Sequence, residues 1–125
     1  MSGGWGRPRV PFSHVETLLV RGDHASARVA LDAFVSEYLR DAPGWLALGR
    51  LLHREFTEPN QALRTLRAGL GAARLTLEQK QHYLSEIVRI CESCEEPERA
   101  IPDLERFVEE HADSPLVEWA RSRLP

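Results

Sequence analysis

Apolar residues recur along this chain at every third or fourth position, in short stretches that turn-forming residues separate. This spacing is that of amphipathic helices, and no stretch shows the alternation typical of a strand. The pattern predicts seven helices and an all-α fold. The helices are expected at 12–20, 24–39, 43–56, 60–74, from Thr76 to a turn at 95–97, from there to about 111, and from 114 onward.

Local signals set the boundaries of these helices. Asp23, after Gly22, and Thr76 are residue types that cap helix N-termini. The run 42–44 is expected to break the chain, although Pro43 is tolerable in a first helical turn. Pro102 falls in the second turn of the helix expected at 97–111, where it would remove a backbone hydrogen bond. We therefore expect a bend there, or a helix that begins later.

The most ordered pattern lies in the middle of the chain. Trp45, Leu48 and Gly49 have W-x2-L-G spacing, and Ala62 is followed four residues later by Leu66. On two helices these positions make matching stripes, with Gly49 allowing a neighbouring helix to approach closely. Neither helix can bury its stripe alone, so the pattern favours stacked copies.

Weaker copies of the stripe formed by Ala62 and Leu66 occur before and after it in the sequence. Each copy has a small residue four positions after an acidic one and four positions before a leucine. The alanines are 35 and 38 residues apart, close to a period of about 34. The three sets are Asp23, Ala27 and Leu31; Glu58, Ala62 and Leu66; and Glu96, Ala100 and Leu104.

On these motifs the chain resembles the tetratricopeptide repeat (TPR) family from about Val10 onward. It departs from the family pattern at Leu52, where tyrosine is usual, and at Leu66, where phenylalanine is usual. The link from Leu52 to Ala62 is also one residue longer than in the family. The resemblance implies a right-handed α-α superhelix of about three helix pairs. The repeats would cover about 12–41, 42–75 and 76–113, with a capping helix at 114–125 and a flexible arm at 1–11 that contains Trp5.

Composition narrows the classes of function. A chain of 125 residues with 42% hydrophobic and 28% charged residues is typical of one globular domain. The net charge of −3 argues against a general nucleic-acid binder. No segment has the length of a membrane span, and two cysteines without a signal sequence predict a cytoplasmic protein.

Candidate chemistry is sparse. Cys91 and Cys94 form a C-x-x-C pair, but no second ligand pair accompanies it, and acidic residues at 92, 95 and 96 would raise the thiol pKa. A redox or metal role for the pair is therefore an alternative with little support. Gly69 and Gly71 do not form a phosphate-binding loop and are expected to permit close packing. We predict a non-enzymatic protein without a cofactor or metal.

The resemblance also implies a binding surface. In TPR arrays the first helices of successive repeats line a concave groove that takes a peptide or helix segment of another protein. The matching positions here make a largely positive strip suited to an acidic or C-terminal peptide. These positions are Arg50, His53, Arg54, His82, Glu86 and Arg89.

Two other interpretations of the surface stay open. The charges on these helices could be ordinary solvated side chains. Alternatively, the chain could be a structural unit whose repeat ends stack into a homo-oligomer, with Leu116 and Trp119 buried between copies.

Overall fold

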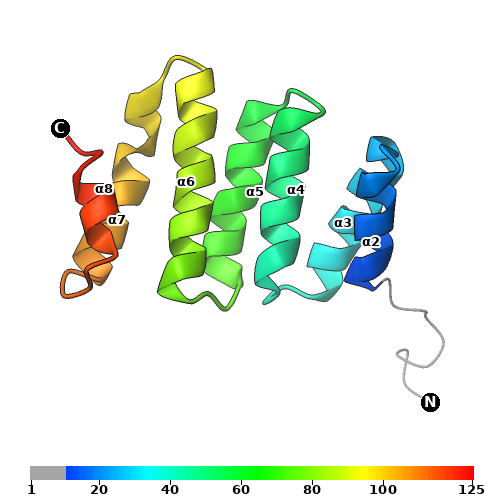
Figure 1. Cartoon of the computed structure of the whole chain (residues 1–125), viewed down its shortest axis with the longest axis horizontal. Coiled ribbons are helices and arrows are strands. Elements are labelled where there is room, and N and C mark those ends of the chain that lie inside the picture. Colours follow the sequence, from blue (N-terminus) through cyan, green and yellow to red (C-terminus); the bar gives the residue numbers. More distant parts are fainter. Residues whose placement is uncertain (1–10) are drawn as a thin grey trace.

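The computed structural model describes residues 11–125, and in this part of the chain it contains helices and no strand (Figure 1). The all-α prediction is therefore confirmed. The arm predicted at 1–11, with Trp5, lies outside the described residues except for its last position. The elements are α2 (Phe12–Val20), α3 (His24–Glu37), α4 (Ala42–Arg54), α5 (Pro59–Ala72), α6 (Leu77–Ser93), the 3₁₀ turn η1 (Pro97–Ala100), α7 (Ile101–Glu110) and α8 (Val117–Arg121).

The helices stand side by side in two layers. Figure 1 shows α2, α4, α6 and α8 toward the viewer, with α3, α5 and α7 behind them. Each element packs on the next one along the chain, with η1 between α6 and α7, and α4 also packs directly on α6. The first and last described helices thus lie at opposite ends of an elongated slab. None of the helices in residues 11–125 has the length and apolar character needed to cross a bilayer.

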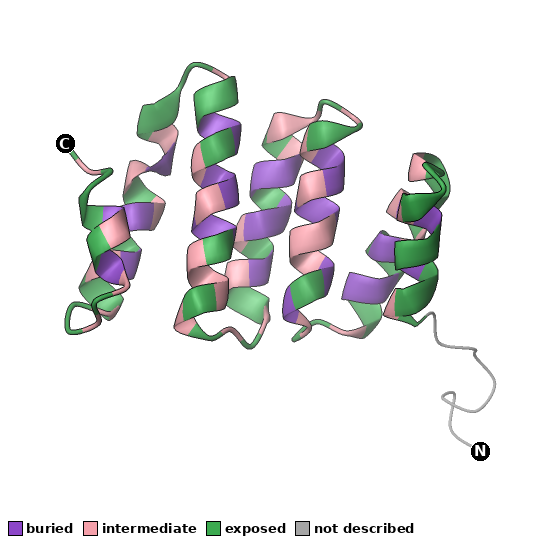
Figure 2. Cartoon of the chain, in the orientation of Figure 1, coloured by how far each residue is buried: buried purple, intermediate pink, exposed green. Residues whose placement is uncertain are grey.

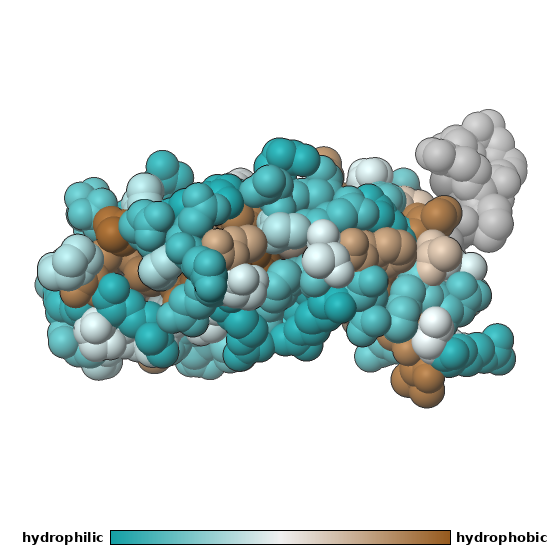
Figure 3. All heavy atoms as spheres, turned by 90° about the horizontal axis from the view of Figure 1, so that it is seen from above, coloured by the Kyte–Doolittle hydropathy of each residue, from teal (hydrophilic) through white to brown (hydrophobic). Residues whose placement is uncertain are grey.

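The core lies where the helices face one another (Figure 2). Seen from above, hydrophobic side chains lie mostly along the middle of the slab and hydrophilic ones along its long sides (Figure 3). The residues expected to form the repeated second-helix stripe are all buried, each with 2% or less of its surface exposed, which confirms that prediction. They are Ala27, Leu31, Ala62, Leu66, Ala100 and Leu104.

The helices of the central pair are held at a distance that glycine sets. A Cβ atom at Gly49 would lie 2.5 Å from Cδ2 of Leu66, and one at Gly69 would lie 2.6 Å from Cβ of Trp45. Both glycines therefore permit close packing, as predicted. At Gly71 no atom lies within 4 Å of the Cβ position, so the same prediction is wrong there. Trp45 is half-buried, and its Nε1 donates a hydrogen bond to the carbonyl of Leu39 at 2.8 Å.

The predicted caps are confirmed. The carboxylate of Asp23 accepts a hydrogen bond from the amide of Ser26, and Thr76 and Gln79 form a reciprocal capping box at the start of α6. The expected break at 42–44 is wrong, because Asp41 caps α4 through the Gly44 amide and the run becomes its first turn. A proline fits there because the first amides of a helix have no partner within it.

The C-terminal region contains two differences in helix length. The helix expected from 97 begins with the 3₁₀ turn η1, and the α-helix starts only at Ile101, which places Pro102 in its first turn. This confirms the late start, because Pro102 loses no helical hydrogen bond at that position. The last helix is shorter than expected, since residues 114–116 form turns and α8 begins at Val117.

Candidate binding face on helices α4 and α6

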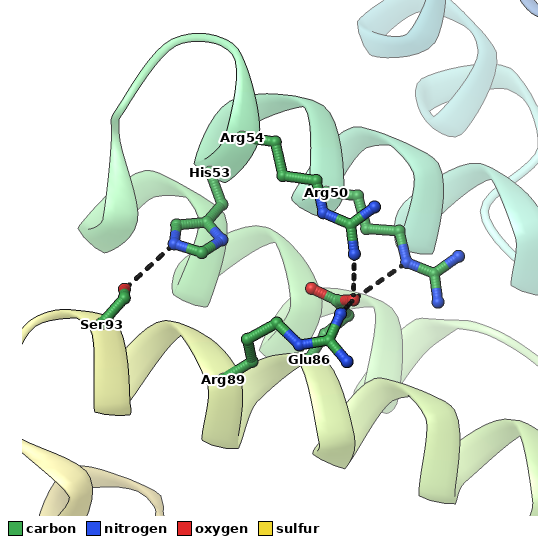
Figure 4. A network of polar contacts seen from close by, with 6 residues as sticks. All are labelled: Arg50, His53, Arg54, Glu86, Arg89 and Ser93. Carbon is green, nitrogen blue, oxygen red and sulfur yellow. Dashed lines mark hydrogen bonds and ion pairs between the residues drawn. The ribbon is translucent and has the colours of Figure 1, made fainter.

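The six predicted site residues lie on two neighbouring helices of the front layer. Arg50, His53 and Arg54 are on α4, at the i, i+3, i+4 spacing that places them on one face. The other three are on α6. Because α4 packs directly on α6, the two sets meet across the contact between these helices (Figure 4).

The centre of this face is Glu86, a carboxylate that is only 2% exposed. Its Oε1 atom accepts hydrogen bonds from Nε of Arg50 at 3.1 Å, from Nη2 of Arg54 at 2.9 Å and from Nη1 of Arg89 at 3.1 Å. Its Oε2 atom is buried and has no hydrogen-bond partner. All three guanidinium groups therefore converge on one oxygen atom (Figure 4).

The charges around Glu86 do not cancel. Three arginines, which stay protonated at any physiological pH, face a single carboxylate. A guanidinium group has five N–H donors, and each of these arginines uses one of them on Glu86. Their side chains are 42%, 48% and 60% exposed for Arg50, Arg54 and Arg89. The face thus presents fixed positive charge and unused donors to solvent.

The two predicted histidines lie differently. His53 points across to α6, where its Nε2 lies 3.0 Å from Oγ of Ser93 (Figure 4). Its Nδ1 is buried without a hydrogen-bond partner, like Oε2 of Glu86. His82 is exposed on α6, one helical turn before Glu86. The structure therefore brings five of the predicted residues together with Ser93, and places His82 at the margin.

Sequence reasoning treated Glu86 as one more groove position and missed its central place. A signal was present, because Glu86 lies three residues after Tyr83 and four before Ile90, on the stripe that α6 buries. A carboxylate on a buried stripe requires a cationic partner. Which cations supply it depends on the distance between α4 and α6, which the sequence does not contain.

The cysteine pair offers little reactivity. Cys91 and Cys94 are both free thiols, and Cys91 is fully buried. Burial raises the pKa of the Cys91 thiol, while the charges of Arg67 and Arg99 act in the opposite direction. The pKa of Cys91 is thus raised, as predicted, but burial rather than the nearby glutamates is the main cause. In residues 11–125 no three His, Cys, Asp or Glu side chains come together as they would around a metal ion.

Comparison with models of protein families, with curated proteins and with solved structures gave no match to this chain. The assignment to a class of protein therefore depends on the sequence pattern and on the geometry described above.

Proposed function

We propose that this protein is a TPR-like repeat protein that acts as a non-catalytic protein–protein interaction module. The repeated stripe, the helix pairs that follow one another along the slab and the glycine-mediated contacts support a right-handed superhelix of three pairs with α8 as a cap. In such an array α4 and α6 are first helices of neighbouring repeats and line the concave groove. Two free cysteines support a cytoplasmic location.

The proposed ligand is an acidic segment of a partner protein, bound on the α4–α6 face. The observation that carries this proposal is the convergence of Arg50, Arg54 and Arg89 on the buried carboxylate of Glu86. Glu86 fixes the three guanidinium groups before a ligand arrives, which lowers the entropy lost on binding. Their remaining donors match carboxylate oxygens in geometry and charge.

Fluorescence anisotropy with labelled acidic peptides tests this proposal. One peptide carries glutamate side chains and an amidated C-terminus, and a second has a free C-terminal carboxylate as its sole negative charge. Their comparison distinguishes side-chain recognition from C-terminal recognition. We expect the replacement of Arg50 and Arg54 by glutamine to weaken binding of the recognised peptide by about tenfold or more.

The matched control is Arg64→Gln, because Arg64 is an exposed arginine of α5 that contacts Gln61 of the same helix. This variant should bind as the parent does. Equal affinity of the parent and the Arg50/Arg54 double variant for every acidic peptide would refute the proposal. Circular dichroism shows whether each variant keeps its helices.

A second candidate function is self-association, which the exposed apolar side chains at the α2–α3 end of the slab favour. Val20 and Val29, near the α2–α3 end of the slab, are 88% and 70% exposed. At the other end Leu116 and Trp119 are half-buried, and Trp119 packs against the core, which supports a capping role for α8 within one chain. Sedimentation equilibrium at micromolar concentration decides this point. A species of monomer mass would exclude stacking of repeat ends in that range.

A further inference from the structure

A cleft away from the Glu86 cluster lies between α5 and the η1–α7 segment of the back layer and the first half of α6 of the front layer. Its volume is about 670 Å³. Leu70 of α5 and Pro102 of α7 supply accessible apolar surface, and Gly71 of α5 also lines the cleft. Leu84 and Phe107 line it too, but they are only 2% and 3% exposed. A Cβ atom at Gly71 would meet no packed neighbour within 4 Å, so this position is open.

Part of the cleft wall is a fixed ion pair. Nε and Nη2 of Arg67 donate to the two carboxylate oxygens of Asp103 at 3.2 and 2.9 Å, and Nη2 also donates to the carbonyl of Arg99 at 3.2 Å. These bonds join α5 to the η1–α7 segment. The hydrogen bonds to Asp103 raise the pKa of Arg67. This pair is internally neutral and makes the wall rigid.

The rest of the rim is mainly cationic. The cleft is lined by four basic side chains and two acidic ones, Asp103 and Glu110. Arg99 lies 3.3 Å from Glu96, whereas Lys80 and Arg106 have no carboxylate within ion-pair distance among the described residues. Nζ of Lys80 instead lies 3.1 Å from Nε2 of His111. Two cations from different helices, α6 and α7, are thus available to an anion in the cleft.

We propose that this cleft binds a small organic anion with an apolar body, with Lys80 and Arg106 holding the anionic group and Leu70 and Pro102 contacting the apolar part. The volume lies within the range of about 300–1,000 Å³ usual for small-molecule sites. Because α5, α6 and the η1–α7 segment border the cleft, we expect a compact ligand. The cleft and the α4–α6 face both include residues of α6. The remaining walls of the cleft belong to α5 and the η1–α7 segment of the back layer, so the two sites are separate.

Titration with naphthalene-2-carboxylate, followed by amide NMR, tests the proposal. We expect the largest shifts at Leu70, Gly71, Leu84 and Phe107. The neutral analogue naphthalene-2-carboxamide has the same shape and should bind about tenfold more weakly, because charge-assisted hydrogen bonds are lost. Equal affinity for the two compounds, or shifts confined to residues outside the cleft, would overturn the proposal. Binding of an acidic peptide in the cleft without binding of the carboxylate would also overturn it.

Two variants separate the apolar and charged parts of the site. Gly71→Leu adds a side chain at a residue that lines the cleft, where a Cβ atom meets no neighbour, and it improves helix propensity, so we expect the variant to fold and to lose binding. Replacement of Lys80 and Arg106 by glutamine should weaken the carboxylate about tenfold and leave the carboxamide unchanged. Arg64→Gln, or glutamine at Arg50 and Arg54, should have no effect on either compound. Full binding by Gly71→Leu would place the ligand elsewhere and refute the proposal.

Discussion

At the scale of single residues, Glu86 determines how the candidate binding face is arranged. A buried carboxylate with three guanidinium donors on one oxygen holds α4 against α6 and fixes the direction of each arginine. Loss of its charge would leave three cations without a partner. Because these arginines are about half exposed, water would solvate part of that charge, and the cost is smaller than for a fully buried cluster.

We therefore predict that Glu86→Gln lowers the free energy of unfolding by about 1–2 kcal/mol. Urea denaturation followed by circular dichroism measures this difference. The matched control is Glu92→Gln, an exposed position on the same helix, which should change stability by less than about 0.5 kcal/mol. Equal stabilities of the two variants would show that the cluster does not stabilise the fold.

A second residue-scale prediction compares two helical glycines. Gly49→Ala would place its Cβ within 2.6 Å of two atoms of Leu66, a fully buried side chain. We expect a loss of about 1–3 kcal/mol from overpacking. Gly71→Ala meets no atom and should gain about 0.5–1 kcal/mol from helix propensity. Thermal denaturation of both variants measures the two effects, and changes of the same sign would contradict this account.

At the scale of elements, the helix ends explain where the chain turns. The acidic residue that precedes each buried alanine of the repeated stripe is the N-terminal flanking residue of its helix: Asp23 for α3, Glu58 for α5 and Glu96 for η1. Negative charge at this position interacts favourably with the helix dipole. The sequence spacing from the acidic residue to the alanine therefore reflects where each of these three elements starts as well as which residues are buried.

The longest helix, α6, has the most complete N-terminal cap, and Thr76→Ala should weaken it. The hydroxyl of Thr76 accepts from the amide of Gln79 at 3.1 Å, and the Gln79 side chain accepts from the Thr76 amide at 2.9 Å. Loss of this box should lower the free energy of unfolding by about 1 kcal/mol in urea denaturation. Thr17→Ala, within α2, removes a hydroxyl that bonds only to its own helix and should be nearly neutral. Equal effects would show that the cap does not matter.

At the scale of the whole molecule, ion pairs connect successive helices of the back layer. Arg28 of α3 binds Glu58 at the start of α5, and Arg67 of α5 binds Asp103 near the start of α7. Each pair joins one back-layer helix to the next. With few contacts beyond neighbouring helices, the stability of such a slab should be distributed locally.

Val117→Ala tests this local distribution of stability. Val117 of α8 is fully buried, and its truncation leaves a cavity that should cost about 1–3 kcal/mol. Amide hydrogen exchange should show reduced protection in α7 and α8 and little change in α4. Val29→Ala, at an exposed position, is the control and should leave exchange unchanged. A uniform loss of protection along the chain would mean that the slab unfolds as one unit.

The sequence by itself determined the local features: the seven α-helices of residues 11–125, their caps at Asp23 and Thr76, the buried stripes, and the arginines that share one face of α4. These features depend on residues within one or two helical turns of each other. Tertiary structure alone decided which cations surround Glu86, why Gly49 is crowded while Gly71 is open, and where a cleft forms between α5 and α7. These features depend on distances between helices, and those are set by the packing of side chains that lie far apart in the chain.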